Sequence, residues 1–481
     1  MKNLTSPFQR QAFMNSRLAL LVSVLAGAIS AATPNFAMMG FASTEGTTTG
    51  GAGGKVVTPT TYAELKQYAE DKSTPYVIRI TKEFNTGVAV KVDASGNIVT
   101  SGGTASTYGD ILKLGSNKTL VGIGSEAFFN RIGIIIQSQS NIIIRNIRFT
   151  MKNVPIARTD ENKIIGWVDG AAKTLTDPDC IGIQADDETI PEASRITRHI
   201  WIDHCEFFNE DPSVMTDVDR YDGLVDGKNN SSNITISWCY FHDHHKASLF
   251  GKGNSDDFDR KITYSHNYFQ NILSRLPLIR FGKVHMLNNY MITSENGTNT
   301  RINSDVYIEG NHYEASKKPV FGKTSENGAA TFVDNKWVTC DRVPQVILAA
   351  GQAPGAEALS ASEEVLAGKF KPSTFYSYKA DPVADVPTLV KTYSGVGKIN
   401  TDEFISGVSA APSPSSGLSV SPLNGRILVE ALAGSRVQFL TAQGKLLQTL
   451  IVGTGAVRSA VLPSGLYVVR AGETSLKVAL P

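Results

Sequence analysis

The sequence predicts an all-β protein, in which a right-handed parallel β-helix is followed by a small C-terminal antiparallel β-sandwich. Three observations carry this prediction. A nine-residue pattern recurs through the middle of the chain, one of its positions holds asparagine at regular intervals, and short apolar strands separated by turn residues fill residues 420–481. Repeats of roughly 20 to 30 residues with one short strand each are typical of solenoids, in which every coil stacks on the previous one.

Length and composition set the limits of this prediction. The 481 residues exceed the usual length of one domain, so we expect one large domain and a smaller one. Hydrophobic residues make up 41% of the chain and charged residues 19%, as in ordinary globular proteins. The formal net charge of +1 provides no whole-chain basic field for nucleic acid or a membrane surface. Any anionic ligand must therefore be held by a local patch.

The N-terminus has the features of a secretory signal peptide, predicted over residues 1–32. Arg10 and Arg17 precede an apolar run at 18–29, and small residues follow that run. The run is too short to cross about 30 Å of hydrocarbon as a helix. We therefore expect no membrane span and a protein that is secreted or held at the cell surface. The four cysteines are too few and too scattered for a disulfide framework, and without a CxxC pair no zinc site is expected.

The main domain is predicted over residues 38–405. Thr61 and Glu64 form a capping-box pattern at the start of a short helix, 62–71, and residues 76–81 are a β-branched run typical of a strand. Helix signals then become scarce. The recurring pattern is a short alternating strand, a small or polar position, any residue, and an aromatic residue or Met. It occurs at residues 141–149, 199–207, 233–241, 261–269, 283–291, 305–313 and 330–337.

The aligned segments share a column that ends in four asparagines. The column consists of Ile147, Cys205, Cys239, Asn267, Asn289, Asn311 and Asn335, and its last four members are 22, 22 and 24 residues apart. A buried amide without partners is costly, but stacked coils allow each Asn to bond the turn backbone and the next Asn. The aromatic column two residues later is expected to stack too. A β-sandwich, the alternative, would not explain the regular spacing.

Interruptions of the pattern predict loops and further segments. The 34 residues between Cys205 and Cys239 predict a coil with a long loop, where function is commonly found. Residues from about 340 to 406 lose the pattern and are expected to pack along the flank of the β-helix. Residues 406–419 (SGVSAAPSPSSGLS) have the composition of a linker, and the β-sandwich follows over 420–481.

Charged residues of both signs are concentrated between 222 and 280. The carboxylates Asp222 and Asp226 come first, and a cationic cluster follows that consists of Lys228, Lys246, Arg275 and Arg280. Grouped carboxylates suit a hard divalent cation such as Ca²⁺, and Lys and Arg suit an anionic substrate. Together they predict a calcium-dependent lyase acting on an acidic polysaccharide. The neighbouring Asp203 and His204, and the run His242–His245, are interpreted as structural, the first pair because adjacent strand residues face opposite ways.

Residues 40 to about 340 resemble the pectate lyases of polysaccharide lyase family one. Six segments match the family in order: GFASTEGTTTGGAGG, NIIIRNIRF, WIDHCEF, DGLVDGK, HHKASLFG and RLPLIRFGKVHMLNNY. The resemblance implies calcium-dependent β-elimination of α-1,4-polygalacturonate to 4,5-unsaturated oligogalacturonides. It implies metal ligands at Asp177, Asp179, Asp222 and Asp226. It also implies catalytic roles for Arg275 as the base, with Lys246 and Arg280, and substrate contacts at Lys228 and Arg301.

Two departures from the family and three rival functions accompany this interpretation. Gly227 replaces a bulkier apolar residue, and Asp217 and Asp219 lie in a loop that varies, which bears on additional calcium ions rather than on the first. A pectin lyase acting on methyl-esterified pectin would lack the acidic cluster. A polygalacturonase would use acid and base carboxylates to activate water. A non-catalytic pectin-binding β-helix would have lost Arg275 or a calcium ligand.

The C-terminal module resembles the sorting domain of the type IX secretion system. The segments that carry this resemblance are SVSPLNGRILVE, TAQGKLLQTL and PSGLYVVR. The resemblance implies the type IX machinery as a partner beside polygalacturonate, and we expect a monomer. A carbohydrate-binding sandwich, the alternative, would show exposed aromatic residues, and Phe439 and Tyr467 are the only aromatic residues of this module.

Overall fold

The computed structural model describes most of the chain after residue 33. The described residues are 34–85, 89–94, 98–99, 101–107, 109–152, 154, 157–158, 164–168, 171–174, 179–186, 195–401, 419–423, 426–430, 436–451, 456–471 and 474–480. The chain divides into two units, Met1–Ala37 and Met38–Pro481. The predicted signal peptide 1–32 lies outside the described residues, as does nearly all of the linker 406–419. The boundaries 38–405 and 420–481 stay predictions.

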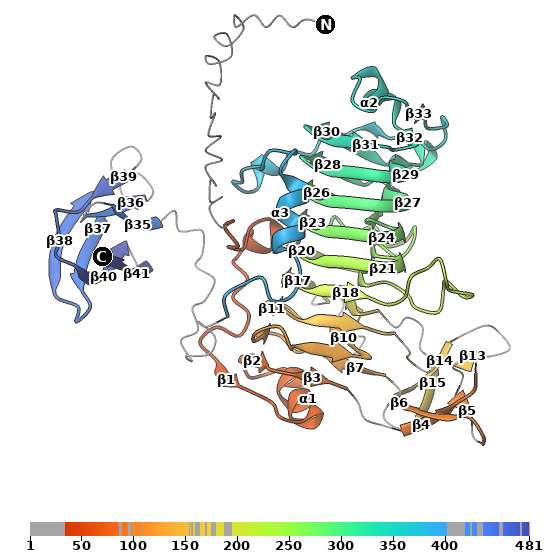
Figure 1. The fold of residues 1–481 in the computed structure, drawn as a ribbon, viewed down its shortest axis with the longest axis horizontal. Helices are drawn as coiled ribbons and strands as arrows, with labels where there is room; N and C mark the ends of the chain where they lie inside the picture. The colour runs from red at the N-terminus through yellow and green to blue at the C-terminus, as the bar shows by residue number, and fades with distance from the viewer. Residues whose placement is uncertain are drawn as a thin grey trace, which may run out of the picture. The chain divides into compact units, whose positions relative to one another are not determined.

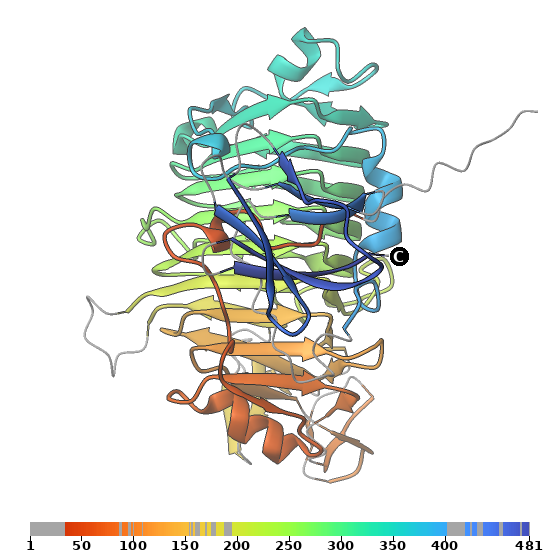
Figure 2. The same cartoon turned by 90° about the vertical axis from the view of Figure 1, so that its left-hand side faces the viewer.

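Parallel strands stack into a β-helix (Figures 1 and 2). One face is a sheet of 11 described strands, and neighbouring strands in it are parallel throughout. The strands, in sheet order, are β1 (Lys55–Val57), β2 (Tyr76–Ile80), β8 (Lys118–Gly122), β11 (Ile142–Arg145), β17 (Thr197–Asp203), β20 (Ser231–Ser237), β23 (Lys261–Ser265), β26 (Lys283–Leu287), β28 (Asp305–Glu309), β30 (Ala329–Val333) and β34 (Leu366–Ala367).

The other two faces are joined through the long strands β27 (Tyr290–Thr300) and β29 (His312–Gly322), which run across both. The second face contains β3 (Glu83–Phe84), β9 (Phe128–Asn130), β12 (Arg148–Thr150), β18 (Glu206–Phe208), β21 (Tyr240–Lys246), β24 (Tyr268–Ser274) and β31 (Lys336–Val338). The third face, which carries the site, contains β7 (Asp110–Lys113), β10 (Ile132–Gln137), β16 (Ile181–Gln184), β19 (Val225–Gly227), β22 (Ser248–Phe250) and β25 (Leu278–Ile279).

Each recurring nine-residue segment is a corner rather than a single strand. In the segment 141–149, β11 ends at Arg145, Asn146 has a φ of 57°, and β12 begins at Arg148 in a different sheet. A residue with positive φ occupies the same place in the later segments, for example His204, Trp238, His266 and Asn288. The prediction of one strand per segment was therefore wrong, because a left-handed turn redirects the chain to the next face.

The asparagine ladder is confirmed. The Asn289 Nδ2 donates to the Tyr264 carbonyl at 3.0 Å and to Asn311 Oδ1 at 2.9 Å. Its Oδ1 accepts from both the backbone N–H and the side-chain amide of Asn267, each at 2.9 Å. Asn311 bonds Asn335 in the same way. Each buried amide is thus satisfied by the coils on either side, which removes the cost of burying it.

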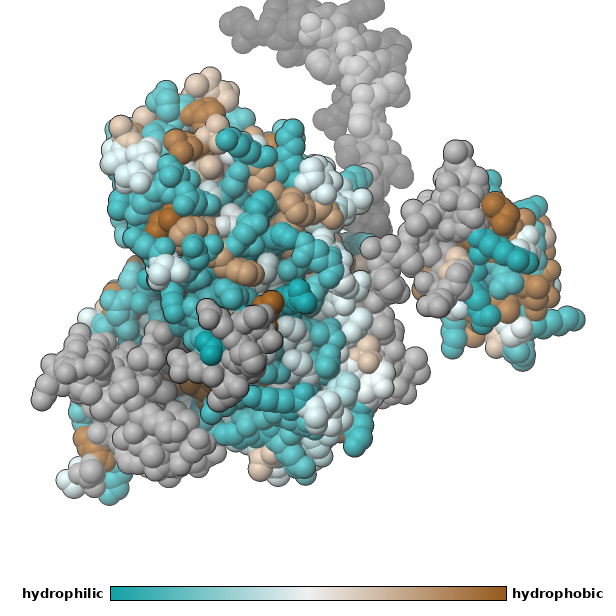
Figure 3. Space-filling view, turned by 180° about the vertical axis from the view of Figure 1, so that it is seen from behind, coloured by the Kyte–Doolittle hydropathy of each residue, from teal (hydrophilic) through white to brown (hydrophobic). Residues whose placement is uncertain are grey.

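The aromatic column is confirmed as a stack in the core. Phe207 stacks on Phe241 with ring centroids 5.0 Å apart, Phe241 stacks on Phe269 at 4.7 Å, and Tyr313 stacks on Trp337 at 4.6 Å. These rings belong to one continuous core that runs through all three faces. The surface of the β-helix in Figure 3 is mainly hydrophilic, with apolar residues scattered over it.

Short helices cover the two ends of the β-helix and its flank (Figure 1). Helix α1 (Tyr62–Glu70) has the predicted Thr61–Glu64 capping box and buries Leu65 and Ala69 in the core at one end. Helix α2 (Gln345–Ala349) buries Ile347 in the same core at the other end. Helix α3 (Val386–Tyr393) packs on Tyr290 along the flank, as expected for the region after residue 340.

Smaller elements lie outside the three faces. Two antiparallel groups precede the site, namely β4 (Ala89–Val92), β5 (Ile98–Val99) and β6 (Thr104–Thr107), then β13 (Ala157–Arg158), β14 (Ile164–Val168) and β15 (Ala171–Thr174). The remaining short elements are η1 (Phe41–Ser43), η3 (Thr324–Glu326), η4 (Pro372–Thr374), β32 (Arg342–Val343) and β33 (Glu357–Ala358). Within the described ranges, no helix has both the length and the apolar character needed to span a membrane.

The C-terminal module is an antiparallel β-sandwich, as predicted. One sheet has the order β35 (Ser419–Leu423), β36 (Arg426–Glu430) and β39 (Ala456–Arg458), and the other has the order β38 (Leu446–Ile451), β37 (Arg436–Thr441), β40 (Gly465–Ala471) and β41 (Thr474–Leu480). Side chains from both sheets share one core, which includes Ile427 and Phe439. Phe439 and Tyr467 are both buried, so neither of the module's two aromatic residues is exposed.

Replacing Asn289 with Ala should destabilise the β-helix by about 2–4 kcal/mol, because the buried backbone N–H and one side-chain N–H of Asn267 lose their acceptor and the Tyr264 carbonyl loses a donor. The midpoint of urea unfolding measures this loss. The matched control is Asn254→Ala at an exposed position, which should change the free energy of unfolding by less than about 0.5 kcal/mol. Equal midpoints for the two variants would show that the ladder contributes nothing to stability.

Candidate metal and substrate site

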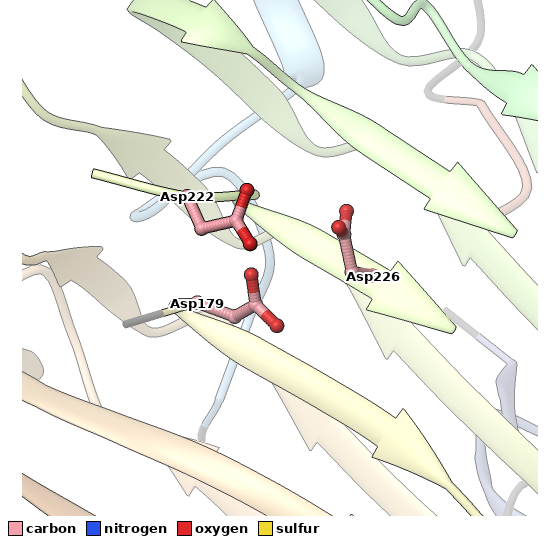
Figure 4. Close-up of side chains that lie close together, drawn as sticks. All are labelled: Asp179, Asp222 and Asp226. Carbon is pink, nitrogen blue, oxygen red and sulfur yellow. The ribbon is translucent and has the colours of Figure 1, made fainter. Parts of the chain in front are cut away.

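Three carboxylates converge on the third face of the β-helix (Figure 4). Asp179 lies just before β16, Asp222 ends the long loop after β18, and Asp226 lies within β19. One oxygen from each can be chosen so that all three lie within 4.8 Å of one another. Asp177, the fourth predicted ligand, lies outside the described residues.

Backbone amides hold two of these carboxylates in place. Asp179 Oδ1 accepts from the Gly223 N–H at 2.8 Å, and Asp226 Oδ1 accepts from the Leu249 N–H at 2.8 Å. Gly223 leaves room for the Asp226 carboxylate, because a Cβ there would lie 2.2 Å from Asp226 Oδ1. Asp222 and Asp226 do not share a strand, because β19 begins only at Val225. The loop brings Asp222 beside the strand instead.

His244 holds the backbone of Asp222 in place. Its Nε2 lies 2.5 Å from the Asp222 carbonyl oxygen, and its Nδ1 lies 3.3 Å from Asn209 Nδ2. The carbonyl can only accept, so Nε2 carries the proton and Nδ1 accepts from the amide. Burial lowers the pKa of His244 to about 4 and so favours this neutral form. Sequence reasoning missed both supports, because a lone Asn and a His in a His-rich run gave no sign of partners far along the chain.

The electrostatics of the three carboxylates favour a bound cation. Burial, and then the charge of Asp222, raises the pKa of Asp226 to about 7. Three carboxylates cannot all be ionised this close together without a compensating positive charge. Carboxylate oxygens are the ligands that Ca²⁺ prefers, and it completes its shell with water or other oxygens. The donor set therefore fits calcium, and Asp179, Asp222 and Asp226 are the carboxylates among the described residues that could hold it.

A column of cations lies beside the carboxylates. The register of the third face pairs Gly227 with Phe250, Phe250 with Ile279, and Ile279 with Thr300 on successive coils. The residues that follow these four positions are Lys228, Gly251, Arg280 and Arg301. Three of the predicted cations therefore line one edge of consecutive strands, because parallel strands in register place equivalent positions side by side. Gly227 leaves room for the Phe250 ring, which a Cβ there would meet at 2.1 Å.

Lys246 and Arg275 lie at the other edge of these strands. Lys246 ends β21, and its Nζ lies 3.3 Å from Asp222 Oδ1 and 3.0 Å from Asp219 Oδ1. Arg275 follows β24 with a φ of 62°. Within the described residues, no hydrogen bond or ion pair engages its guanidinium. Its charge still acts on the site, since it opposes the rise in the Asp226 pKa.

The other two predicted arginines are already engaged. Arg280 Nη1 donates to the Gly251 carbonyl at 2.8 Å, and burial together with Arg301 and Arg275 lowers the pKa of Arg280. Arg301 forms a two-pronged ion pair with Glu326, with Nη2 and Oε1 2.7 Å apart. Arg301 lowers the pKa of Glu326 to about 2. A substrate carboxylate that reaches Arg301 would therefore meet a guanidinium that Glu326 already holds.

The two histidine motifs belong to the framework. The ring of His204 lies 2.7 Å from the Asp203 carboxylate, so these neighbours do not face opposite ways. That expectation was wrong because His204 lies after the end of β17 with a φ of 50°. In the run His242–His245 the side chains diverge: His242 contacts Asp243, His244 the Asp222 carbonyl, and His245 the Asp219 carboxylate.

Comparison with known proteins identifies the chain's relatives. A family model described as pectate lyase matches residues 14–399. The pectate trisaccharide-lyase of Bacillus licheniformis is 34% identical over 367 residues, which cover 76% of this chain and 88% of that protein. Pectate lyase A of Aspergillus niger is 31% identical over 238 residues, which cover 48% of this chain and 62% of that protein.

Solved structures agree with these sequence relatives. A pectate lyase from a Bacillus species, solved in complex with trigalacturonate, has a TM-score of 0.55 and 27% identity, covering 76% of this chain and all of that one. The thermostable pectate lyase PL 47 has a TM-score of 0.55 at 24% identity, covering 75% of this chain and 97% of that one, and supports the fold alone.

Replacing Asp226 with Asn should weaken calcium binding at least about tenfold, because the most buried of the three clustered carboxylates loses its charge. Isothermal titration of the purified protein with calcium measures the change. Asp257→Asn, at an exposed position in the loop between β22 and β23, is the matched control and should bind calcium as the unmodified chain does. Unchanged affinity in Asp226→Asn would place the metal elsewhere.

Proposed function

Because the chain belongs to the pectate lyase family, we propose that it cleaves α-1,4-linked polygalacturonate by calcium-dependent β-elimination, leaving 4,5-unsaturated oligogalacturonides. The observation that carries the proposal is the pairing of two clusters on one face. Three carboxylates suited to calcium lie beside a column of cations suited to the carboxylate that every galacturonate unit carries.

The carboxylates of the site would hold the metal, with Asp177 completing the set formed by Asp179, Asp222 and Asp226. Calcium, when bound, would ligate substrate carboxylates and stabilise the negative charge that develops beside them. His244 and the Gly223 amide keep the ligands in position without contributing charge. Lys246 adds a fixed ammonium group next to Asp222, where it can neutralise charge on a substrate carboxylate.

Arg275 is proposed as the base that removes the C5 hydrogen, which lies alpha to the galacturonate carboxylate. An arginine is an unusual base because its guanidinium is ordinarily protonated. Two features support the assignment: the described residues leave its guanidinium unengaged, and its charge and that of Arg280 repel each other. After the proton leaves, the bond between C4 and the glycosidic oxygen breaks and that oxygen takes up a proton. Water is not consumed.

The remaining cations are proposed to bind and orient the chain of galacturonates. Lys228, Arg280 and Arg301 lie at one edge of four successive coils, with Gly251 between Lys228 and Arg280, so they can meet carboxylates along the polysaccharide. The hydrogen bond from Arg280 to the Gly251 carbonyl fixes the direction of the guanidinium. Arg280 is proposed to orient the substrate or Arg275. A pectin lyase would act on methyl esters, for which neither the acidic cluster nor this column of cations is suited.

The ends of the chain are proposed to serve export. Residues 1–32 are proposed as a signal peptide, because an apolar run at 18–29 is followed by small residues. The C-terminal sandwich is proposed as a type IX secretion sorting domain, which its sequence segments support. Both of its aromatic residues are buried, which disfavours a carbohydrate-binding role. The enzyme would then act outside the cell, where pectin is found.

The first test of the function follows the ultraviolet absorbance of unsaturated uronate while the purified protein acts on polygalacturonate. Absorbance should rise with calcium present and stop when a chelator is added, because the site loses its metal. Methyl-esterified pectin should give a much smaller signal. New reducing ends without absorbance would identify a hydrolase and refute the elimination.

Replacing Arg275 with Lys should lower kcat by about 10²-fold or more, because an ammonium on a shorter arm cannot take the same proton. Calcium affinity and the unfolding temperature should stay within error of the unmodified chain. Arg198→Lys, at an exposed position on β17, is the matched control and should retain full activity. An Arg275→Lys enzyme with normal kcat would show that another group is the base.

A further inference from the structure

A buried ion pair lies behind the column of cations and has no part in the chemistry above. Arg260 Nη2 and Asp256 Oδ1 are 2.5 Å apart, and the two side chains are 0% and 1% exposed. Both residues belong to the segment between β22 and β23. A fully buried pair of charges is costly to desolvate and is a weak source of stability by itself. The contacts that it makes are therefore the feature to explain.

The pair bonds the backbone at the cationic positions. Asp256 Oδ2 accepts from the Asn229 N–H at 3.0 Å and from the Lys252 N–H at 2.9 Å. Arg260 donates from Nη2 to the Asn229 carbonyl at 3.1 Å and from Nη1 to the Arg280 carbonyl at 2.5 Å. Asn229 directly follows Lys228. One carboxylate and one guanidinium thus link three successive coils, at Arg280 and at the residues that directly follow Lys228 and Gly251.

Gly251 shows why the pair can reach this place. In the register of the third face, Gly251 is the member of the column without a side chain. Its φ is 96°, and a Cβ there would lie 2.8 Å from the Arg280 Cβ and 2.9 Å from Arg260 Nη1. Arg280 reaches across this gap to the Gly251 carbonyl. Gly282 also leaves room for Arg260, since a Cβ added at Gly282 would lie 2.5 Å from the Arg260 Cγ.

We propose that Asp256 and Arg260 are positioning residues for substrate recognition. They fix the backbone next to Lys228 and at Arg280, and so set where these two cations meet carboxylates of the polysaccharide. The inference rests on the proposed function, because it assigns Lys228 and Arg280 to the substrate. It predicts that loss of the pair acts on substrate affinity through these two cations and not through the metal.

The test is a double-mutant cycle read by binding. All variants carry Arg275→Lys so that substrate is not consumed, and calorimetry at saturating calcium gives the affinity for trigalacturonate. Asp256→Asn should weaken binding about tenfold, since misplacing two cations removes most of their contribution. In a background with Lys228→Ala and Arg280→Ala, the same change should weaken binding less than about twofold, because residues that act as a unit are not additive.

Control variants separate positioning from general damage. Asp203→Asn removes a buried carboxylate that pairs with Arg145 on the first face, and it should leave trigalacturonate affinity within about twofold even if it lowers the unfolding temperature. Calcium affinity should be unchanged in Asp256→Asn. Arg260→Lys keeps the charge but cannot donate to both the Asn229 and the Arg280 carbonyls, so it should weaken trigalacturonate binding as Asp256→Asn does. It replaces Asp256→Asn in the cycle if that variant does not fold.

The outcomes are distinct from those that decide the proposed function. An equal effect of Asp256→Asn with and without Lys228 and Arg280 would overturn the inference, as would no effect at all, because either result means that the pair does not act through those cations. The proposed function stands or falls on the absorbance of unsaturated product made by the chain with Arg275 intact. The binding cycle can therefore contradict the positioning role while the lyase activity is confirmed, and the lyase activity can be refuted while the binding cycle gives the expected result.

Discussion

The β-helix, and the site on it, depend on the in-register stacking of one coil on the next. Parallel strands about 4.8 Å apart repeat equivalent positions at that spacing, so whatever side chain occupies a position meets its counterpart on the neighbouring coil. For amides and aromatic rings this is favourable: Asn289 bonds the coils above and below it, and Phe241 stacks between Phe207 and Phe269. The core is thus built from columns rather than from individual contacts.

For charged side chains the same stacking is unfavourable, because it places like charges side by side. Stacking brings Asp179 close to Asp222 and Asp226, and it places Lys228, Arg280 and Arg301 along one edge. The molecule offsets part of this repulsion internally, through Lys246 on Asp222 and Glu326 on Arg301, and it leaves the pKa of Asp226 raised to about 7. The part that remains can be offset by a cation and a polyanion together, which is the physical reason for proposing that the two clusters form one site.

Much of this could be predicted from the sequence, for identifiable reasons. The asparagine and aromatic columns repeat at nearly constant spacing, so residues 267–337 reveal the stacking directly. The concentration of charge between 222 and 280 indicated the site directly, whereas the proposed roles of Asp179 and Arg301 followed from the resemblance, since both lie outside that stretch. The corner at Asn146 was missed because nothing in the alternation of residues signals a left-handed turn. Gly223, Asn209 and Glu326 were missed because each acts on a partner from another coil.

A stack in which every coil templates the next has no intrinsic length. Any uncovered terminal strand offers a row of backbone donors and acceptors, and a second chain could continue the pattern there. Helices α1 and α2 bury Leu65 and Ile347 in the core at the two ends and so act as terminators. The same architecture without these helices would have the geometry of a growing fibre.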